Sequence, residues 1–149
     1  RRSPAERSSH PRRRRPERTY GAGRESIVYI IIHPMKTDNY FFPANDFEAT
    51  KRFYADVLGL AVKFDFSSMG MVAYRIGDDE PALILKDTSR FPDAQPALWI
   101  EVENVAAEYA KMKERGVRFL SEPFPIQTGW AVEFEDPSGN RLGITDYKA

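Results

Sequence analysis

The chain has 149 residues, of which 42% are hydrophobic and 30% charged, a composition typical of one globular domain or two fused small modules. It contains no cysteine, which excludes disulfides, thiolate metal sites and cysteine nucleophiles and fits a cytoplasmic protein. The 22 basic and 22 acidic residues balance, yet nine arginines and only two glutamates lie in residues 1–24. Residues 25–149 therefore hold 13 basic and 20 acidic residues and are not expected to bind nucleic acid.

Residues 1–34 are predicted to lie outside the folded domain. Residues 1–26 are rich in Arg, Ser and Pro and offer almost nothing to bury, which is typical of a disordered segment. The four arginines Arg12–Arg15 could form a nucleic-acid-binding arm, but no aromatic residues are interleaved with them, and MKTDNYFFPAND from Met35 onward reads as a native start. We therefore interpret residues 1–34 as a disordered or non-native Arg-rich extension. The apolar run IVYIII, residues 27–32, is too short for a membrane span or a secretion signal, and could instead add an edge strand or bind a partner.

The first predicted elements are a strand, a helix and three further strands. Residues 39–44 (NYFFPA) form a short strand, and Asp46 is a suitable N-cap for a helix that ends at Gly59. Apolar residues recur in this helix at spacings of three and four, which predicts a stripe that packs on a sheet. The stripe consists of Phe47, Thr50, Phe53, Tyr54, Val57 and Leu58. Strands are predicted at residues 62–66, 71–76 and 82–86, because turn-forming residues separate these runs.

The second half of the chain repeats this order. ALWIEVEN, residues 97–104, matches NYFFPAND, residues 39–46, so Asn104 takes the place of the capping Asp46, and the next helix ends at Gly116. Strands follow near residues 118–120, 130–135 and 141–145, the last two joined by the turn sequence DPSG. The sequence thus predicts an α+β fold of two tandem βαβββ modules. Module one covers residues 35–86, a linker covers residues 87–96, and module two covers residues 97–149.

Two segments resemble the hallmark segments of the vicinal oxygen chelate superfamily, which includes glyoxalase I, extradiol dioxygenases, fosfomycin-resistance enzymes and bleomycin-resistance proteins. They are DFEATKRFYADVLGL, which begins at Asp46, and FEDPSGNRLGI, which begins at Phe134. The resemblance covers residues 35–149 and implies that the two modules form a curled mixed sheet around a concave cavity, in a protein expected to be a homodimer. It does not fix the function, because one fold hosts many chemistries.

Catalytic members of this superfamily hold a divalent metal ion with His and Glu side chains on the concave face. The resemblance places the corresponding positions at Asn39, Ala97, Gly143 and about Ile84. None of these is a strong metal ligand, and the only histidines, His10 and His33, precede Met35. Carboxylates alone could still form a magnesium or calcium site, but the acidic residues show no clustered spacing. We therefore expect neither a metal ion nor another cofactor.

Strand alternation predicts which side chains face the cavity. The ligand-binding residues predicted in this way are Asn39, Phe41, Lys86, Trp99, Glu101, Glu133 and Arg141. On the opposite face of the sheet, we expect Tyr40 and Phe42 to pack on the first helix and Trp130 to belong to the core. Trp99 could stack on a ligand or be plain core packing, and Glu101 could be solvated or paired with an arginine.

Three functions are compatible with such a cavity. The favoured prediction is a metal-independent protein that, like the bleomycin-resistance branch, sequesters a small hydrophobic or cationic molecule. The alternative is a metal-free isomerase or lyase in which Glu101 or Glu133, with a pKa raised by apolar walls, acts as general base. The third is a dimeric module that binds a partner through residues 27–32. Neither nucleic acid nor a membrane is an expected partner.

Overall fold

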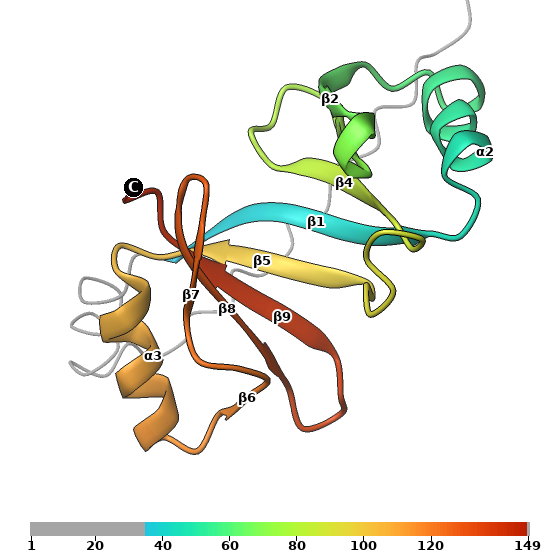
Figure 1. Ribbon diagram of the computed structural model, residues 1–149. Coiled ribbons are helices and arrows are strands. Elements are labelled where there is room, and N and C mark those ends of the chain that lie inside the picture. Colours follow the sequence, from blue (N-terminus) through green and yellow to red (C-terminus); the bar gives the residue numbers. More distant parts are fainter. Residues whose placement is uncertain (1–34, 149) are drawn as a thin grey trace, which may run out of the picture. The chain divides into compact units, whose positions relative to one another are not determined.

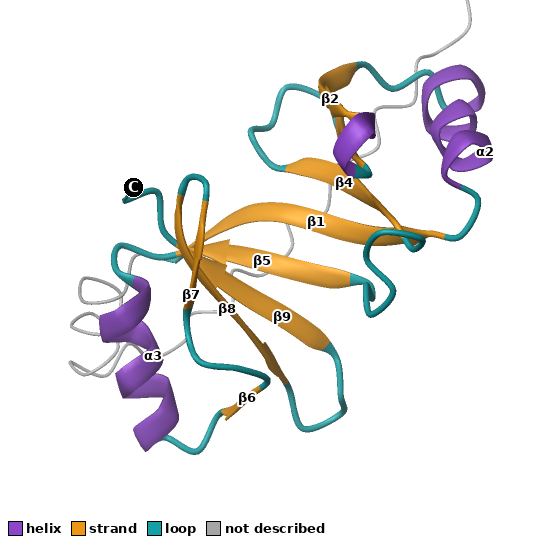
Figure 2. Cartoon of the chain, in the orientation of Figure 1, coloured by secondary structure: helices purple, strands orange, loops and turns teal. Residues whose placement is uncertain are grey.

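The computed structural model describes residues 35–148, and the predictions for residues 1–34 lie outside this part of the chain. Within residues 35–148, nine strands form one mixed sheet in the order β2-β3-β4-β1-β5-β9-β8-β6, with β7 paired to β8 (Figure 1). The strands are β1 (Lys36–Ala44), β2 (Val62–Phe66), β3 (Met71–Arg75), β4 (Ala82–Asp87), β5 (Ala97–Glu101), β6 (Arg118–Phe119), β7 (Phe124–Ile126), β8 (Gly129–Glu135) and β9 (Arg141–Thr145). The helices α2 (Phe47–Arg52) and α3 (Val105–Glu114) follow β1 and β5 (Figure 2). Neither of them is long and apolar enough to cross a bilayer.

The two predicted modules are equivalent halves of this sheet. In module one, β1 runs parallel to β4 and Phe41 lies opposite Ile84. In module two, β5 runs parallel to β9 and Trp99 lies opposite Gly143. β1 and β5 pair in the antiparallel direction, with Phe41 opposite Ala97, and this pairing joins the modules. The predicted α+β fold of tandem βαβββ modules is confirmed, with one additional short strand, β7, that the sequence does not predict.

Equivalent side chains begin the two helices. Asp46 Oδ1 accepts a hydrogen bond from the backbone N–H of Ala49 at 3.0 Å, and Asn104 Oδ1 accepts one from Ala107 at 2.8 Å. Each bond satisfies an N–H group that has no partner within the first helical turn. Both predicted N-caps are confirmed, and they place each helix at the same point after its strand.

The apolar stripe predicted for the first helix is only partly correct. Phe47 is buried, but Phe53, Val57 and Leu58 are 47%, 71% and 51% exposed. The reason is that α2 is short: Phe53–Val57 form a π-helical turn, in which Leu58 N–H donates to the Phe53 carbonyl at 3.0 Å. The wider turn breaks the spacing of three and four, so the last apolar residues no longer face the sheet.

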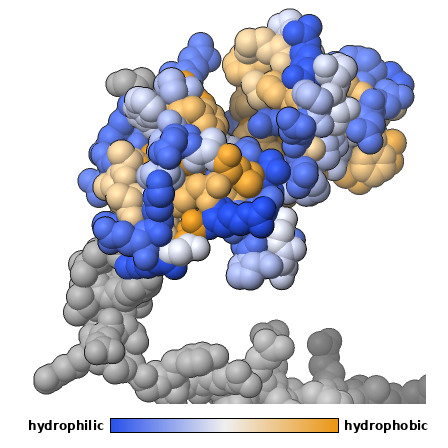
Figure 3. Space-filling view, turned by 60° about the horizontal axis from the view of Figure 1, so that its bottom comes forward, coloured by the Kyte–Doolittle hydropathy of each residue, from blue (hydrophilic) through white to orange (hydrophobic). Residues whose placement is uncertain are grey.

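Three aromatic residues predicted to be packed are instead exposed. Tyr40, Phe42 and Trp130 are 40%, 37% and 46% exposed. On the face drawn in Figure 3, hydrophobic surface (orange) alternates with hydrophilic surface (blue). α2 packs beside β4 and against the end of β1 at Ala44, which leaves Tyr40 and Phe42 open. Trp130 lies in the hairpin with β7, opposite Pro125, whereas α3 packs with Phe134, further along β8.

The core on the helix side of the sheet consists of two clusters, one for each helix. The cluster at α2 contains Ala44, Phe47, Val72, Tyr74, Leu83 and Leu85. The cluster at α3 contains Val102, Val105, Val132, Phe134 and Ile144. On the opposite face, Ala73, Ala82 and Ile84 form a smaller cluster with Phe41. Residues of β5, β8 and β9 on that opposite face remain available to line a pocket.

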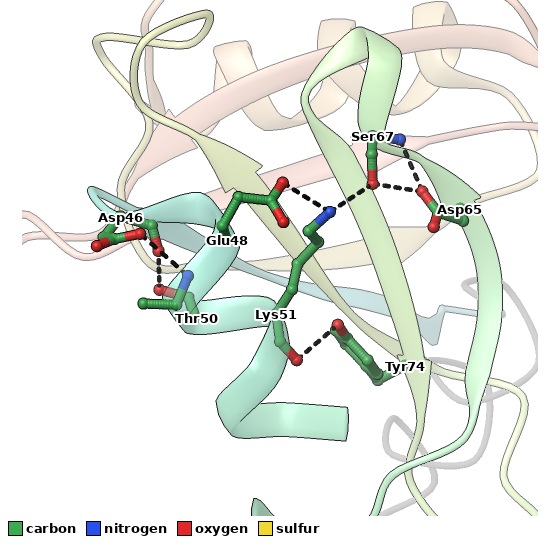
Figure 4. A network of polar contacts seen from close by, with 8 residues as sticks. Asp46, Glu48, Thr50, Lys51, Asp65, Ser67 and Tyr74 are labelled. Atoms are coloured by element: carbon green, nitrogen blue, oxygen red, sulfur yellow. Dashed lines mark hydrogen bonds and ion pairs between the residues drawn. The ribbon is translucent and has the colours of Figure 1, made fainter. Parts of the chain in front are cut away.

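Lys51 ties α2 to the neighbouring strands. Its Nζ lies 2.8 Å from Glu48 Oε1 and donates to Ser67 Oγ at 3.2 Å, while its carbonyl accepts from the Tyr74 hydroxyl at 3.1 Å (Figure 4). Ser67 in turn donates to Asp65, and its side-chain and backbone hydrogen bonds lower the pKa of that carboxyl. These contacts hold the short helix against β2 and β3.

Candidate functional site

A pocket of about 290 Å³ lies on the sheet face opposite the helices. The strands contribute Phe41 from β1, Lys86 from β4, Ala97 and Trp99 from β5, Glu133 from β8 and Arg141 from β9. These side chains share one face because successive residues of a strand point to opposite sides. The structure therefore brings together five of the seven predicted ligand-binding residues, namely Phe41, Lys86, Trp99, Glu133 and Arg141.

Trp99 forms an apolar floor for this pocket. The residue is 6% exposed, and its ring lies 5.4 Å from that of Phe41, centroid to centroid, at an angle of 56°. Its indole packs directly on Gly143, where an added Cβ would lie 2.6 Å from Trp99 Cε2. Only glycine fits at position 143 beneath the indole in this arrangement, because carbon atoms in contact are normally about 3.5–4.0 Å apart.

Lys86 is a cation held between aromatic rings. Its Nζ lies 4.5 Å from the ring centroid of Phe41 and 5.3 Å from that of Phe91. No carboxylate among residues 35–148 lies within ion-pairing distance of this nitrogen. Burial lowers the pKa of Lys86, Glu133 opposes that shift, and Arg141 adds to it. The amine is thus poorly solvated and lacks a direct counter-ion.

Arg141 and Glu133 form an ion pair across neighbouring strands. Arg141 Nη1 lies 3.1 Å from Glu133 Oε2, and their side chains are 15% and 25% exposed. Two other nitrogens of the pocket residues, Arg141 Nε and Trp99 Nε1, are buried and have no hydrogen-bond partner. Such unsatisfied donors are rare in folded proteins, because each costs free energy relative to the solvated chain.

The charges that line the pocket do not balance. Lys86, Arg141 and Arg90 contribute positive charge, whereas Glu133 and Asp93 contribute negative charge. Because Glu133 is already paired with Arg141, the partly buried ammonium of Lys86 has no ion pair of its own among residues 35–148. The surplus and the two unsatisfied donors favour a ligand that accepts hydrogen bonds.

Two predicted ligand-binding residues, Asn39 and Glu101, lie elsewhere. Both line a separate hollow of about 580 Å³, together with Lys36 and Tyr147. Asn39 Oδ1 accepts from the backbone N–H of Ala82 at 2.9 Å, and Glu101 pairs with Lys36 at 3.3 Å. They point to the same sheet face as the pocket residues but sit further along their strands, where each residue adds about 3.3 Å.

The linker supplies a wall that the sequence reading did not predict. Residues 90–95 line the pocket, and Phe91 faces the Lys86 ammonium. An available signal was the single large aromatic in DTSRFPDAQP, because an apolar ring in an otherwise polar linker needs a surface to pack on.

The residues present do not fit the metal site that the fold family implies. Gly143 has no side chain and lies under Trp99, and Asn39 already uses its carbonyl oxygen for the backbone of Ala82. Ile84 and Ala97, at the other two positions, have no ligand atoms. Across residues 35–148, no three His, Cys, Asp or Glu side chains are grouped so that they could hold a metal ion.

Residues 31–144 match the model of the Glyoxalase/Bleomycin resistance protein/Dioxygenase superfamily. The chain belongs to this superfamily. Among curated proteins, the glyoxalase-superfamily chain is similar to the uncharacterized protein YetH of Bacillus subtilis (strain 168), with 45% identity over 40 residues. The match covers 27% of this chain and 33% of YetH, so it spans only about a third of that relative.

Solved structures share the architecture of this superfamily member. A hypothetical protein from Bacillus halodurans C-125 superposes with a TM-score of 0.63 and 18% identity, over 78% of this chain and 96% of that one. Methylmalonyl-CoA epimerase from Mycobacterium tuberculosis gives a TM-score of 0.60 and 14% identity, over 76% and 88% of the two chains. At these identities the similarity concerns the fold, so the function must be inferred from the pocket's own side chains.

Proposed function

We propose that this glyoxalase-superfamily protein binds a small organic molecule in the 290 Å³ pocket, without a metal ion and without chemical turnover. The contact between Trp99 and Gly143 carries the proposal. It takes the space that a metal-binding carboxylate at position 143 would need, and it gives the pocket an apolar floor next to Phe41. Such a floor suits a ring or an aliphatic body.

The size and the lining of the pocket restrict which kinds of ligand it can bind. The pocket is at the lower end of the range of about 300–1,000 Å³ that is usual for ligand sites, which favours a small molecule. Of the two ligand classes expected from the sequence, a hydrophobic molecule is better supported than a cation. Glu101 lies outside the pocket, and Glu133 is already neutralised by Arg141 at 3.1 Å.

Native mass spectrometry of freshly purified protein tests the proposal. We expect a noncovalent organic adduct, one per chain, that persists after dialysis against EDTA. Trp99→Ala, which removes the pocket floor, is expected to lose the adduct, whereas Trp130→Ala, which removes the exposed tryptophan outside the pocket, is expected to keep it. An adduct that disappears with EDTA, or one tightly bound transition-metal ion per chain in elemental analysis, would reject the metal-independent function.

A metal-free isomerase or lyase is the second candidate. It now depends on Glu133, the only one of the two proposed general bases that lines the pocket. Glu133 Oε2 lies 3.1 Å from Arg141 Nη1, so a substrate would have to place its acidic C–H or O–H group within hydrogen-bonding reach of this paired carboxylate. Turnover that Glu133→Gln abolishes and Glu101→Gln preserves would favour the enzyme over a pure binding protein.

A homodimer is the assembly we propose. Several large apolar side chains of module one are at least 44% exposed, namely Phe53, Val57, Leu58, Val62, Phe66 and Met69. Apolar surface of this kind is common where subunits associate. Light scattering coupled to gel filtration should give the mass of two chains, and Val57→Glu combined with Leu58→Glu should shift it to one. A monomer at all concentrations tested would refute the dimer.

A further inference from the structure

We propose that the ligand of the pocket is an organic anion, a carboxylate attached to a flat apolar body, and that Lys86 and Arg141 hold the anionic group together with the Trp99 indole N–H. This inference rests on the proposed binding function and adds the charge of the ligand to it.

Lys86 lacks a counter-ion that a bound carboxylate could supply. Its ammonium lies against two aromatic rings, at 4.5 Å and 5.3 Å, and has no direct carboxylate partner among the described residues. Contact with ring faces stabilises a cation only modestly compared with a desolvated ion pair. A bound carboxylate would supply the missing counter-ion in a place where water screens little.

Two donors of the pocket residues are unsatisfied. Arg141 Nε and Trp99 Nε1 are both shielded from solvent and lack partners, although both residues line the pocket. A carboxylate has two oxygens that together accept about four hydrogen bonds, so one group can serve several convergent donors. A small rearrangement of these side chains on binding would give each nitrogen an acceptor.

The charges of the lining disfavour a cationic ligand, because the carboxylates Glu133 and Asp93 are outnumbered by three basic side chains. The carboxylate of Glu133 is held by Arg141 at 3.1 Å, and a ligand cation would have to enter beside Lys86, Arg141 and Arg90. The apolar body has its own place, because Phe41, Phe91 and Ala97 line the same pocket. An aromatic carboxylate satisfies both parts of the lining.

Three naphthalene probes of similar size separate charge from shape: 2-naphthoate is anionic, 2-naphthamide is neutral and 2-naphthylmethylamine is cationic. Isothermal titration calorimetry on the full chain is expected to give 2-naphthoate an affinity at least about tenfold above that of the amide, because charge-assisted hydrogen bonds exceed neutral ones. The amine should bind weakest. Equal affinities for acid and amide, or a preference for the amine, would overturn the anionic ligand and leave the binding function standing. Failure of all three probes to bind would overturn the flat anionic ligand, whereas the binding function itself is judged by the adduct in native mass spectrometry.

Matched variants locate the anionic group. Lys86→Met keeps an apolar side chain between the rings but removes the charge, and should lower 2-naphthoate affinity about tenfold while leaving 2-naphthamide within about twofold. Lys36→Met makes the same charge change on β1 outside the pocket, and should alter neither affinity. Equal losses for both probes in Lys86→Met would indicate a change in shape and would refute the role of the charge.

Nuclear magnetic resonance tests the indole separately. The chain has two tryptophans, so two indole N–H signals are expected, and Trp130, exposed and outside the pocket, is an internal reference. Addition of 2-naphthoate should move the Trp99 signal downfield and leave that of Trp130 in place. An unchanged Trp99 signal at saturation would remove the indole from the anion site.

Discussion

Gly143→Ala adds one methyl group at the centre of the pocket floor. The new Cβ would lie 2.6, 2.7 and 2.9 Å from three indole atoms of Trp99, Cε2, Cδ2 and Cζ2. Carbon atoms in contact normally stay about 3.5–4.0 Å apart, so the indole or the strands β5 and β9 must move by about 1 Å. Because Trp99 lines the pocket, a displaced indole would move into the pocket volume.

The size of the effect follows from two opposing terms. Overpacking of a core position costs about 1–3 kcal/mol, whereas replacing glycine by alanine inside a strand gains about 0.5–1 kcal/mol when there is room. Gly143 lies in β9 and does not have a positive φ, so alanine suits its backbone. We therefore expect the free energy of unfolding to fall by about 1–2 kcal/mol, and the affinity for 2-naphthoate to fall as the displaced indole fills the pocket.

Urea denaturation followed by far-ultraviolet circular dichroism measures this loss, and a double-mutant cycle assigns it to the indole. In a Trp99→Leu background, where the ring is absent, Gly143→Ala should change the free energy of unfolding by less than about 0.5 kcal/mol. If Gly143→Ala is as stable as wild type and binds 2-naphthoate equally well, the close contact between Trp99 and position 143 does not control the pocket, and the reasoning fails.

Three further predictions concern pH and the helix caps. Affinity for 2-naphthoate should fall as pH rises through the lowered pKa of Lys86, because the neutral amine no longer attracts the carboxylate. The charged groups that line the pocket with Lys86 are Glu133, Asp93, Arg90 and Arg141, and they are unchanged in Lys86→Met, so titration calorimetry should find no such fall in that variant. Burial lowers the pKa of Lys86 in the folded state, so the charged amine disfavours folding. The free energy of unfolding of wild type minus that of Lys86→Met should therefore rise with pH, from the lowered pKa up to about 10.4, the pKa of an unfolded lysine. A difference that is flat or falls with pH would contradict the burial of this amine. Asp46→Ala and Asn104→Ala should each lower the free energy of unfolding by about 1 kcal/mol in urea denaturation, because each removes a helix cap. Asp46→Ser, which can still cap the helix, should keep most of the wild-type stability. Alanine variants as stable as wild type would mean that the caps contribute nothing.

The order of elements could be predicted because the signals that specify it are local. Asp46 and Asn104 cap helices through bonds to residues three positions later, and the turn after β8 depends on Asp136 and Gly139, which bond to one another. Such contacts need no knowledge of the rest of the fold. The same holds for the face of each strand: alternation alone assigns Lys86, Trp99 and Arg141 to one face, and the three side chains line one pocket.

The errors arose where a regular spacing is interrupted or where distant elements decide the outcome. A helical stripe through Phe53 and Leu58 assumes that α-helical spacing continues, but the π-helical turn at Phe53–Val57 ends it. Alternation also gives a face but not a position along the strand, so it could not separate Glu101, next to Lys36, from Glu133, next to Arg141. The linker wall at Phe91 depends on where the loop folds back, which no periodic pattern encodes.

The inner layer of the sheet explains why a repeated backbone yields one asymmetric pocket. Phe41 opposite Ile84 in module one and Trp99 opposite Gly143 in module two occupy equivalent register positions, yet their side chains divide the space differently. The Ile84 side chain is buried in the cluster with Phe41. Gly143 has no side chain, and the indole of Trp99 from the neighbouring strand occupies the space above it. Gly143 thus has two effects. It provides no carboxylate that could hold a metal ion, and it leaves room for the Trp99 indole as the floor of a pocket that Lys86 and Arg141 also line. Introducing a glutamate at position 143 alone is therefore not expected to create a metal site, because the indole already occupies the space that the glutamate needs.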